Sequence, residues 1–136
     1  MSVLVDTSVI IDVITDDPLW ATWSVRQLEA NAAAGLVINP VIYAELCFGF
    51  SVVEPVDELV REFGLLYREI PRPGLFRAAK AFGAYKSRGG TKDSVLPDFF
   101  VGGHAEATGL PVLTRDPGRI QAYFPTVRLI APVGAR

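Results

Sequence analysis

The stretch VLVDTSVIIDVI at residues 3–14 decides the fold. Its first three residues form a continuous apolar run, which is typical of a strand that is buried on both faces of a parallel sheet. Asp6 ends the run, and residues 7–14 have the pattern of a short helix. Ligands bind at the carboxyl ends of the strands in open α/β folds, so this order of elements places Asp6 where a site is expected.

Apolar runs and helical segments alternate along the rest of the chain. We expect strands at 36–39, 66–70, 111–114 and 126–130. We expect helices from Pro18 to Gly35, from Pro40 onward, near 55–64, over 75–88 and over 97–108, and a turn at Pro117-Gly118. This alternation predicts an α/β fold of three layers, in which helices cover both faces of a central, mainly parallel sheet of about five strands. With 136 residues and no linker or repeat, the chain is expected to form a single domain over 1–136.

Composition excludes several classes of protein. Half of the residues are hydrophobic, which argues against disorder. No apolar stretch reaches the roughly 18 residues that a membrane span requires, and Asp6 interrupts the first apolar run too early for a signal peptide. The single cysteine, Cys47, cannot form an internal disulfide and is expected to be a buried thiol. We therefore expect a cytoplasmic protein without a membrane association.

Charge is distributed unevenly although the net charge is only −2. Residues 1–60 contain nine acids and one base, Arg26, whereas residues 61–92 contain two acids and eight bases. An acidic pocket beside a basic surface suits an enzyme that holds a metal ion and binds a polyanion. A solvated basic helix face explains the second segment equally well, so both interpretations stay open here.

Four carboxylates stand at boundaries between expected elements. Asp6 and Asp116 follow strands, Glu45 lies in the helix that begins at Pro40, and Asp98 follows Pro97 at the start of another helix. Mg²⁺ and Mn²⁺ prefer oxygen ligands, with water and substrate phosphate in the remaining positions. Taken together, the four acids predict a site for such a cation on one rim of the sheet.

Each of these acids also has an ordinary structural explanation. Asp6 and Asp98 can be helix-capping or first-turn acids, Glu45 a solvated helix residue, and Asp116 part of an Asp-Pro-Gly turn. The remaining acids fit a site less well, because Asp12, Asp16 and Asp17 are expected to be solvated or capping residues and Asp93 lies in a loop. His104, the only histidine, is expected to be packed inside and not to act in catalysis.

Three ordered motifs carry a family resemblance. Residues 3–12 (VLVDTSVIID), 96–105 (LPDFFVGGHA) and 113–116 (LTRD), the last followed by YFPTVRLIAP at 123–132, resemble the motifs of PIN-domain ribonucleases, specifically VapC-type toxins of toxin–antitoxin pairs. Glu45 stands where that family has a helix-borne glutamate. The pair Gly102-Gly103 departs from the alanines or isoleucine often found there, and we expect it to loosen its helix. Residues 50–95 match no motif.

The resemblance implies a PIN fold and a function. It implies a metal-dependent endoribonuclease that hydrolyses RNA phosphodiester bonds, with Asp6, Glu45, Asp98 and Asp116 as both the catalytic and the metal-holding set for Mg²⁺ or Mn²⁺. Ser8 and Thr114 are candidates for polar support of that set. Expected partners are a cognate VapB-type antitoxin, the RNA substrate and a second copy of the chain in a homodimer. Candidate RNA contacts are Arg77, Lys80, Lys86, Arg88, Lys92 and Arg115.

Other functions remain as alternatives. A phosphatase of the haloacid dehalogenase type requires a second aspartate two residues after the first, where this chain has Ser8. A receiver-like signalling domain requires an acidic pair that is not evident. The main alternative is therefore a catalytically silent PIN-like module that binds RNA or another protein.

One helix has the pattern of an interface. On a helical wheel Ala21, Val25, Leu28 and Ala32 form one face, which suits packing on the sheet, and Trp20 and Trp23 point away from it. This arrangement predicts that the two indole rings are exposed and bind a partner. The alternative is that both rings pack inside.

Overall fold

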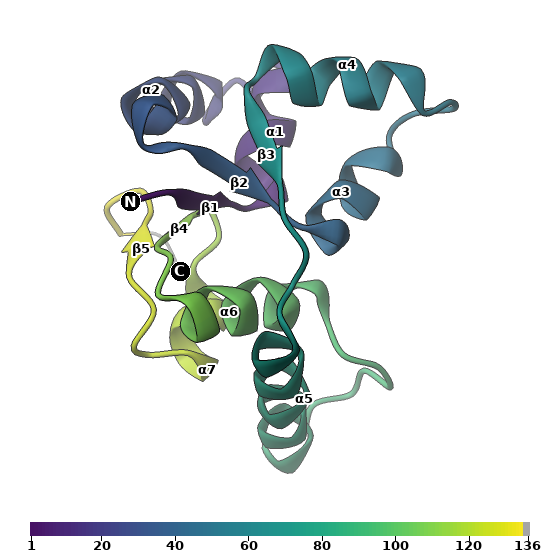
Figure 1. Cartoon of the computed structure of the whole chain (residues 1–136). Coiled ribbons are helices and arrows are strands. Elements are labelled where there is room, and N and C mark those ends of the chain that lie inside the picture. The colour runs from purple at the N-terminus through teal and green to yellow at the C-terminus, as the bar shows by residue number, and fades with distance from the viewer. Residues whose placement is uncertain (135–136) are drawn as a thin grey trace.

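A parallel sheet of five strands runs through the molecule with helices on both sides (Figure 1). The computed structural model describes residues 1–134. The strands are β1 (Val3–Val5), β2 (Leu36–Ile38), β3 (Leu65–Tyr67), β4 (Val112–Leu113) and β5 (Leu129–Ile130), in the order β3-β2-β1-β4-β5. All neighbouring strands pair in parallel. The predicted α/β class, the parallel sheet and its number of strands are confirmed.

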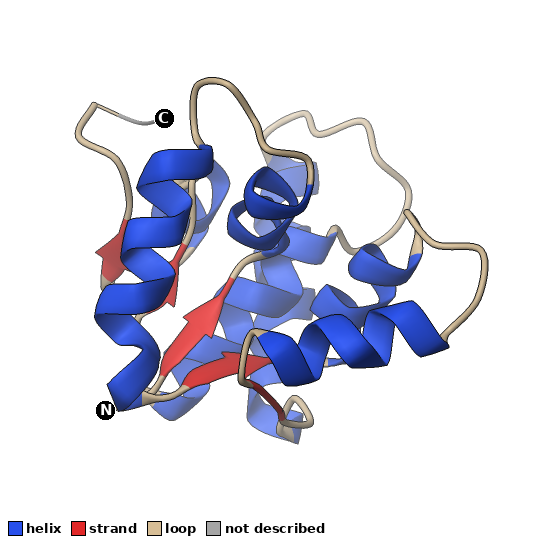
Figure 2. Cartoon of the chain, turned by 90° about the horizontal axis from the view of Figure 1, so that it is seen from above, coloured by secondary structure: helices blue, strands red, loops and turns tan. Residues whose placement is uncertain are grey.

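The helices form the two outer layers. They are α1 (Thr7–Ile14), α2 (Ala21–Asn31), α3 (Pro40–Cys47), α4 (Glu54–Glu62), α5 (Arg72–Ser87), α6 (Pro97–Thr108) and α7 (Gly118–Tyr123), with one turn of 3₁₀ helix at Ala32–Ala34. Figure 1 shows α1, α2 and α4 on one side of the sheet and α5, α6 and α7 on the other. Helix α3 contacts α1 and α6. Figure 2 gives the view from above, in which the strands lie between the helices.

The order of the strands reverses at β1. The chain first builds outward from β1 through β2 to β3, and then returns to place β4 and β5 on the opposite side of β1. The crossover connections of parallel strands are right-handed, so this reversal puts the later helices on the other face. In sheets of this kind a ligand binds outside the carboxyl ends of the strands at the point of reversal. Here that point lies between β1 and β4.

The helices around this point begin and end at residues that are recognisable in the local sequence. The carboxylate of Asp6 accepts a hydrogen bond from the amide of Thr7 and caps α1. Asn39 caps α3 by accepting from the amide of Ile42, with Pro40 in the first helical position. Pro97 opens α6, and Gly109 closes it with the left-handed φ of 74° that favours glycine. Because the strands are short, these caps fix where each helix starts relative to the edge of the sheet.

The core is continuous from one helical layer to the other. Strands β1 and β2 are buried along their whole length, as the apolar runs in the sequence predicted. Below the sheet, Phe99 packs between Tyr123 and Phe124, with ring centroids 5.2 and 6.5 Å away. Area burial and edge-to-face packing of such rings both stabilise a core. This aromatic group anchors α6, the helix that carries Asp98.

The two glycines of α6 serve close packing. A Cβ at Gly102 would lie 2.2 Å from the ring of Phe124, and a Cβ at Gly103 would lie 2.4 Å from the carbonyl oxygen of Gly74 in α5. Both positions therefore need a residue without a side chain. The expectation that these glycines loosen the helix is wrong, because they let α5 and Phe124 approach it.

Several element boundaries differ from the predicted ones. Helix α5 begins at Arg72, three residues before the predicted start at 75, since Pro73 fits in the first turn, where its missing N–H is not needed. Strand β3 occupies 65–67 and not 66–70, because its pairing with β2 starts at Leu65. Strands β4 and β5 are also shorter than predicted. Where a turn was predicted at Pro117-Gly118, the chain forms the six-residue helix α7.

The predicted packing face of α2 is only partly correct, because Leu28 is the one of its four residues that is buried. The buried residues of this helix are Ser24 and Leu28, and Val25 is exposed. Trp23 packs against the core and Trp20 is half-buried beneath the guanidinium of Arg115, 5.9 Å from the ring centroid. The indole rings are therefore not the exposed pair that the interface hypothesis required. Cys47 is likewise half-buried and not fully buried.

No helix among residues 1–134 is long and apolar enough to cross a lipid bilayer.

Candidate functional site

Asp6 lies where β1 ends, at the reversal point of the sheet. Its backbone amide donates to the carbonyl oxygen of Leu113, which continues the pairing with β4. Its carboxylate is only 7% exposed. Oδ2 accepts hydrogen bonds from Thr114 Oγ1 at 2.7 Å and from Ser8 Oγ at 3.0 Å, while Oδ1 accepts from the amide of Thr7. The two predicted polar-support residues, Ser8 and Thr114, thus both contact Asp6.

Glu45 and Asp98 face the same edge from different helices. Glu45 Oε1 in α3 accepts a hydrogen bond of 2.7 Å from Thr7 Oγ1, so α1 orients this glutamate. Asp98 stands in the first turn of α6, where the helix dipole favours a negative charge. Its Oδ2 pairs with Arg119 Nη1 of α7 at 3.3 Å. Arg119 was not among the predicted site residues.

Asp116 is held by a chain of polar contacts. It is the most exposed of the four acids, with 63% of its side chain accessible, and it pairs with Arg115 Nη1 at 3.3 Å. The same guanidinium binds Asp12 through Nε at 2.8 Å. Asp12 was predicted to be solvated or capping, but it is 1% exposed and also accepts from Ser24 Oγ. This buried pair fixes the loop that carries Asp116 onto α1 and α2.

The carboxylates influence one another electrostatically. The pKa of Asp6 is raised from 3.8 to about 6, chiefly by burial and also by the charges of Asp98 and Glu45, while the hydrogen bonds from Thr114 and Ser8 act in the opposite direction. Burial and the charge of Asp98 also raise the pKa of Glu45. The pKa of Asp98 is raised mainly by burial, against the lowering effect of Arg119. The edge of the sheet therefore carries negative charge that the protein only partly compensates.

The donor set matches a hard divalent cation in its chemistry. All four side chains offer carboxylate oxygens, which Mg²⁺ and Mn²⁺ prefer. A cation near Asp6 would stabilise the ionised carboxylate and so lower its raised pKa. In residues 1–134, however, no three acidic, histidine or cysteine side chains converge closely enough to hold a metal ion. Asp98 and Asp116 are turned toward Arg119 and Arg115. The residues therefore fit a cation in their chemistry, while two of the carboxylates are paired with arginines in this structure.

A buried hydrogen bond connects the helices that carry Glu45 and Asp98. Asn39 Nδ2 lies 3.2 Å from His104 Nδ1, and both side chains are almost fully buried. Because Asn39 Oδ1 already accepts from Ile42, Nδ2 is the donor, so Nδ1 of His104 accepts and the proton is on Nε2. Burial also lowers the pKa of His104. His104 is thus a packed structural residue, as predicted, and it connects α6 to the start of α3.

Two cavities adjoin the carboxylate edge and its basic side. One, of about 460 Å³, is lined by Tyr85, Asp98, Asp116, Gly118, Arg119 and Tyr123. The other, of about 350 Å³, lies between α5 and α7, shares Tyr123 and contains Arg77, Lys80 and Arg88. We call the second one the basic groove. Three predicted RNA-contact residues therefore meet in one place beside the carboxylates.

The other predicted RNA contacts lie elsewhere. Lys86 Nζ donates to the backbone carbonyl oxygen of Lys92, and neither lysine lines the basic groove. Arg115 is bound to Asp12 and Asp116. Arg77 also pairs with Glu106 at 3.1 Å. The structure thus separates three basic residues that line the groove from three that do not.

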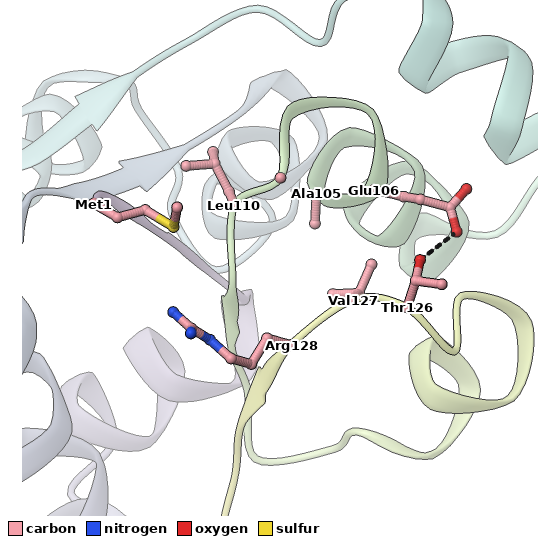
Figure 3. Close-up of a pocket in the computed structure, with 8 residues that line it drawn as sticks. Met1, Ala105, Glu106, Leu110, Thr126, Val127 and Arg128 are labelled. Atoms are coloured by element: carbon pink, nitrogen blue, oxygen red, sulfur yellow. Dashed lines mark hydrogen bonds between the residues drawn. The ribbon is translucent and has the colours of Figure 1, made fainter.

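A smaller cavity lies at the opposite edge of the sheet (Figure 3). It has a volume of about 200 Å³ and is lined by residues that precede β1, β4 and β5, including Met1, Leu110 and Arg128. Figure 3 shows Thr126 hydrogen-bonded to Glu106 at its rim. The amino ends of the strands are not where α/β folds bind their ligands. This cavity is therefore separate from the candidate site.

Sequence reasoning missed Thr7, Asp12, Asn39 and Arg119. Asn39 could have been found, because an asparagine between an apolar run and a proline is a helix-capping pattern. Thr7 follows the strand directly and was a second clue. Asp12 and Arg119 had no local signal. The partner of Asp12 is remote in the sequence, and Arg119 itself lies in α7, a helix too short to show periodicity.

Comparisons with known proteins agree with this geometry. The family model described as PIN domain matches residues 3–124. No curated protein sequence matches the chain. Among solved structures, the chain is similar to VapBC2 from Rickettsia felis bound to a DNA fragment from the promoter, with a TM-score of 0.73, 18% identity, and coverage of 96% of this chain and 98% of that one.

Two further solved structures have the same fold. DNA-bound VapBC from Salmonella typhimurium matches with a TM-score of 0.70 and 19% identity, covering 96% of this chain and 98% of that one. FitAcB from Neisseria gonorrhoeae matches with a TM-score of 0.67 and 20% identity, covering 96% of both chains.

Proposed function

This chain belongs to the PIN domain family, and from that premise we propose that it is a metal-dependent endoribonuclease, the VapC-type toxin of a toxin–antitoxin pair. PIN domains are generally nucleases. The observation that carries the proposal is Asp6, a buried carboxylate whose pKa is raised to about 6 beside Asp98 and Glu45. A structural role alone does not require three acids whose charges oppose one another. A divalent cation and a phosphate substrate give that arrangement a purpose.

In the proposed reaction, Asp6, Glu45, Asp98 and Asp116 hold Mg²⁺ or Mn²⁺. When bound, the cation lowers the pKa of a water molecule and stabilises the charge that develops on the phosphate. A carboxylate of the cluster accepts the proton of the attacking water. Ser8 and Thr114 orient the carboxylate of Asp6 through Oδ2. Hydrolysis by water leaves a 5′-phosphate and a 3′-hydroxyl.

The basic groove is the proposed path of the RNA. Arg77, Lys80 and Arg88 line it together, and Tyr123 joins it to the cavity that contains Asp98 and Asp116. Lysine and arginine contacts to phosphates supply binding that is independent of sequence. We include Arg77, Lys80 and Arg88 in this path because they line the groove, and leave out Lys86, Lys92 and Arg115 because they do not.

An antitoxin is the proposed protein partner. The solved structures of similar fold are described as VapBC and toxin–antitoxin complexes. On this chain a cavity of about 670 Å³, lined mainly by apolar residues of α1 and α3, lies beside Glu45. Phe48 at its rim is 95% exposed, and Val52 and Val53 follow it. An apolar surface of this kind is a docking surface for a partner, and we propose that it receives the antitoxin of a cytoplasmic complex that also contains a second copy of this chain.

The test is RNA cleavage by the purified protein with Mg²⁺ or Mn²⁺, with and without a chelator. Asp6→Asn and Asp98→Asn should each abolish cleavage, and Asp93→Asn, a change of an exposed loop acid, should not. Full activity of the first two variants would contradict the assignment. RNA binding without cleavage by the wild-type protein under all metal conditions would instead favour a catalytically silent PIN-like module.

A second test addresses the partner. The product of a small reading frame that overlaps or adjoins this gene should co-purify with the chain and suppress cleavage. Phe48→Ser should weaken that complex while leaving the cleavage activity of the free protein intact. Equal complex stability in the variant would place the antitoxin on another surface.

A further inference from the structure

Arg119 occupies a position between the carboxylates and the basic groove. Its Nη1 pairs with Asp98 Oδ2 at 3.3 Å, and 43% of its side chain is exposed. It lines the cavity of about 460 Å³ that also contains Asp116. The positive charge of Arg119 beside this carboxylate makes the site less negative in the absence of a metal ion, and opposes the rise in the pKa of Asp98 that burial causes.

Tyr85 holds the guanidinium in place. The guanidinium carbon of Arg119 lies 5.9 Å from the centroid of the Tyr85 ring, which is a favourable cation–π geometry. The ring is itself fixed, since its hydroxyl accepts hydrogen bonds of 3.2 Å from the amides of Thr91 and Lys92 and its edge packs on Phe99 at 5.7 Å. Arg119 can therefore leave Asp98 and remain over the same ring.

A second arginine is arranged in the same way. The guanidinium carbon of Arg88 lies 4.6 Å from the centroid of the Tyr123 ring, and the two tyrosine rings are 6.4 Å apart. Tyr123 lines both the cavity of Arg119 and the basic groove of Arg88. Two guanidinium groups are thus held by neighbouring aromatic rings, and one of them, that of Arg119, pairs with Asp98. Arginine in this setting binds phosphate through its planar fork.

We propose that Arg119 exchanges partners during binding. Without a cation it pairs with Asp98; when the cation takes Asp98, Arg119 turns to a phosphate of the RNA strand adjacent to the bond that is cut. The cavity of Tyr85, Arg119 and Tyr123 is then a phosphate subsite that continues into the basic groove. The inference rests on the proposed nuclease function. It adds to that function a coupling, because cation binding and nucleic-acid binding each favour the other.

The exchange predicts opposite effects of one substitution on two ligands. In Arg119→Gln, Asp98 loses its competitor, so the protein without RNA should bind Mn²⁺ about five-fold more tightly, at the lower end of usual coupling between sites. The same variant should also bind RNA more weakly than the wild type. With Ca²⁺ in place of Mn²⁺, its affinity for a fluorescein-labelled single-stranded RNA of about 12 nucleotides should fall about ten-fold, since one charged phosphate contact is removed. Arg119→Lys keeps the charge but lacks the fork, and should fall between the two proteins. A residue that only supports the fold would weaken both kinds of binding together.

The measurements are calorimetry for Mn²⁺ and fluorescence anisotropy for the RNA, so neither depends on cleavage. Arg128→Gln, at the opposite edge of the sheet, is the matched control and should change neither affinity. Unchanged or weaker Mn²⁺ binding by Arg119→Gln would overturn the exchange even if cleavage by the wild type is established. A wild-type protein that binds neither Mn²⁺ nor the RNA would overturn the proposed function itself, and the exchange with it.

Discussion

Individual residues determine how much negative charge the site tolerates. Asp6 is a helix cap, a hydrogen-bond acceptor for two hydroxyls and a neighbour of two other acids. The capping interpretation and the site interpretation of this residue are therefore compatible. The cap uses Oδ1 and the two hydroxyls use Oδ2, so one carboxylate serves both the helix and the site.

The raised pKa of Asp6 predicts how stability depends on pH. The pKa is about 6 in the folded protein and has its ordinary value of 3.8 in the unfolded chain, so between these values the folded protein binds more protons than the unfolded chain. Without a divalent cation, the free energy of unfolding should therefore fall as the pH rises through this interval, by up to roughly 3 kcal/mol. Urea titrations in chelator at about pH 4.5 and about pH 7.5, on either side of the raised pKa, measure this difference.

Asp6→Asn is the matched variant for that prediction. An amide does not ionise, so the variant should lose most of this slope and be at least as stable as the wild type at the higher pH. Asp93→Asn should keep the wild-type slope. A slope that persists in Asp6→Asn would assign the pH dependence to other groups.

The buried pair of Asp12 and Arg115 gives a second prediction at this scale. Asp12 is almost fully buried and accepts from both Ser24 and Arg115, so Asp12→Ala should remove two hydrogen bonds and lower the free energy of unfolding by roughly 2 kcal/mol. The comparable change of an exposed acid on α2, Glu29→Ala, should lie within about 0.5 kcal/mol of zero. Thermal or urea unfolding of both variants makes the comparison. A small effect for Asp12→Ala would mean that Arg115 finds enough compensation in Asp116.

At the scale of elements, the contact of α5 with α6 depends on glycine. A Cβ at Gly103 would lie 2.4 Å from Gly74 O and 3.0 Å from Ala78 N, and both are backbone atoms that cannot move aside cheaply. Gly103→Ala should therefore cost about 2 kcal/mol or more of stability. Gly83→Ala in α5, where nothing lies within 4 Å of the added Cβ, should instead stabilise the protein by up to about 1 kcal/mol. The Tm values of both variants can be measured by calorimetry. Shifts of the two Tm values in the same direction would contradict this contrast.

The sequence predicted elements well where their signals are local. The apolar runs identified β1 and β2, and Asp6, Pro97 and Gly109 identified three helix boundaries. It failed where the deciding interaction is remote. Helix α7 has six residues, too few for a hydrophobic period, and α2 faces the core through Ser24, whose hydroxyl binds Asp12 and not an apolar surface. The four carboxylates were recognisable by position, whereas Arg119 was visible only once α7 had been placed beside α6.

At the scale of the whole molecule, charge separates into an acidic edge and a basic groove. The uneven distribution of charge in the sequence became informative only once the fold showed which basic residues line the groove. Lys80 lines the groove, and Lys86, further along the same helix, binds the backbone of Lys92. Sequence distance alone could not have separated the two lysines.

This division predicts a difference in salt dependence. If the groove tracks a single-stranded RNA, Lys80→Ala should reduce the slope of log K against log salt concentration by about 0.7, the value for one phosphate contact, and Lys86→Ala should leave it unchanged. Anisotropy titrations at several salt concentrations provide both slopes. Equal changes in the two variants would mean that the groove is not the path of the strand.

The parallel sheet also governs when the site can come into existence during synthesis of the chain. Asp6 emerges from the ribosome early, but the hydroxyl that orients it belongs to Thr114, 108 positions later. The strand that pairs with β1 on that side is β4, which is also made late. A growing polypeptide therefore carries separate, unassembled acids until translation is nearly over. For a protein proposed to cut RNA, this delay protects the message and the ribosome that are producing it.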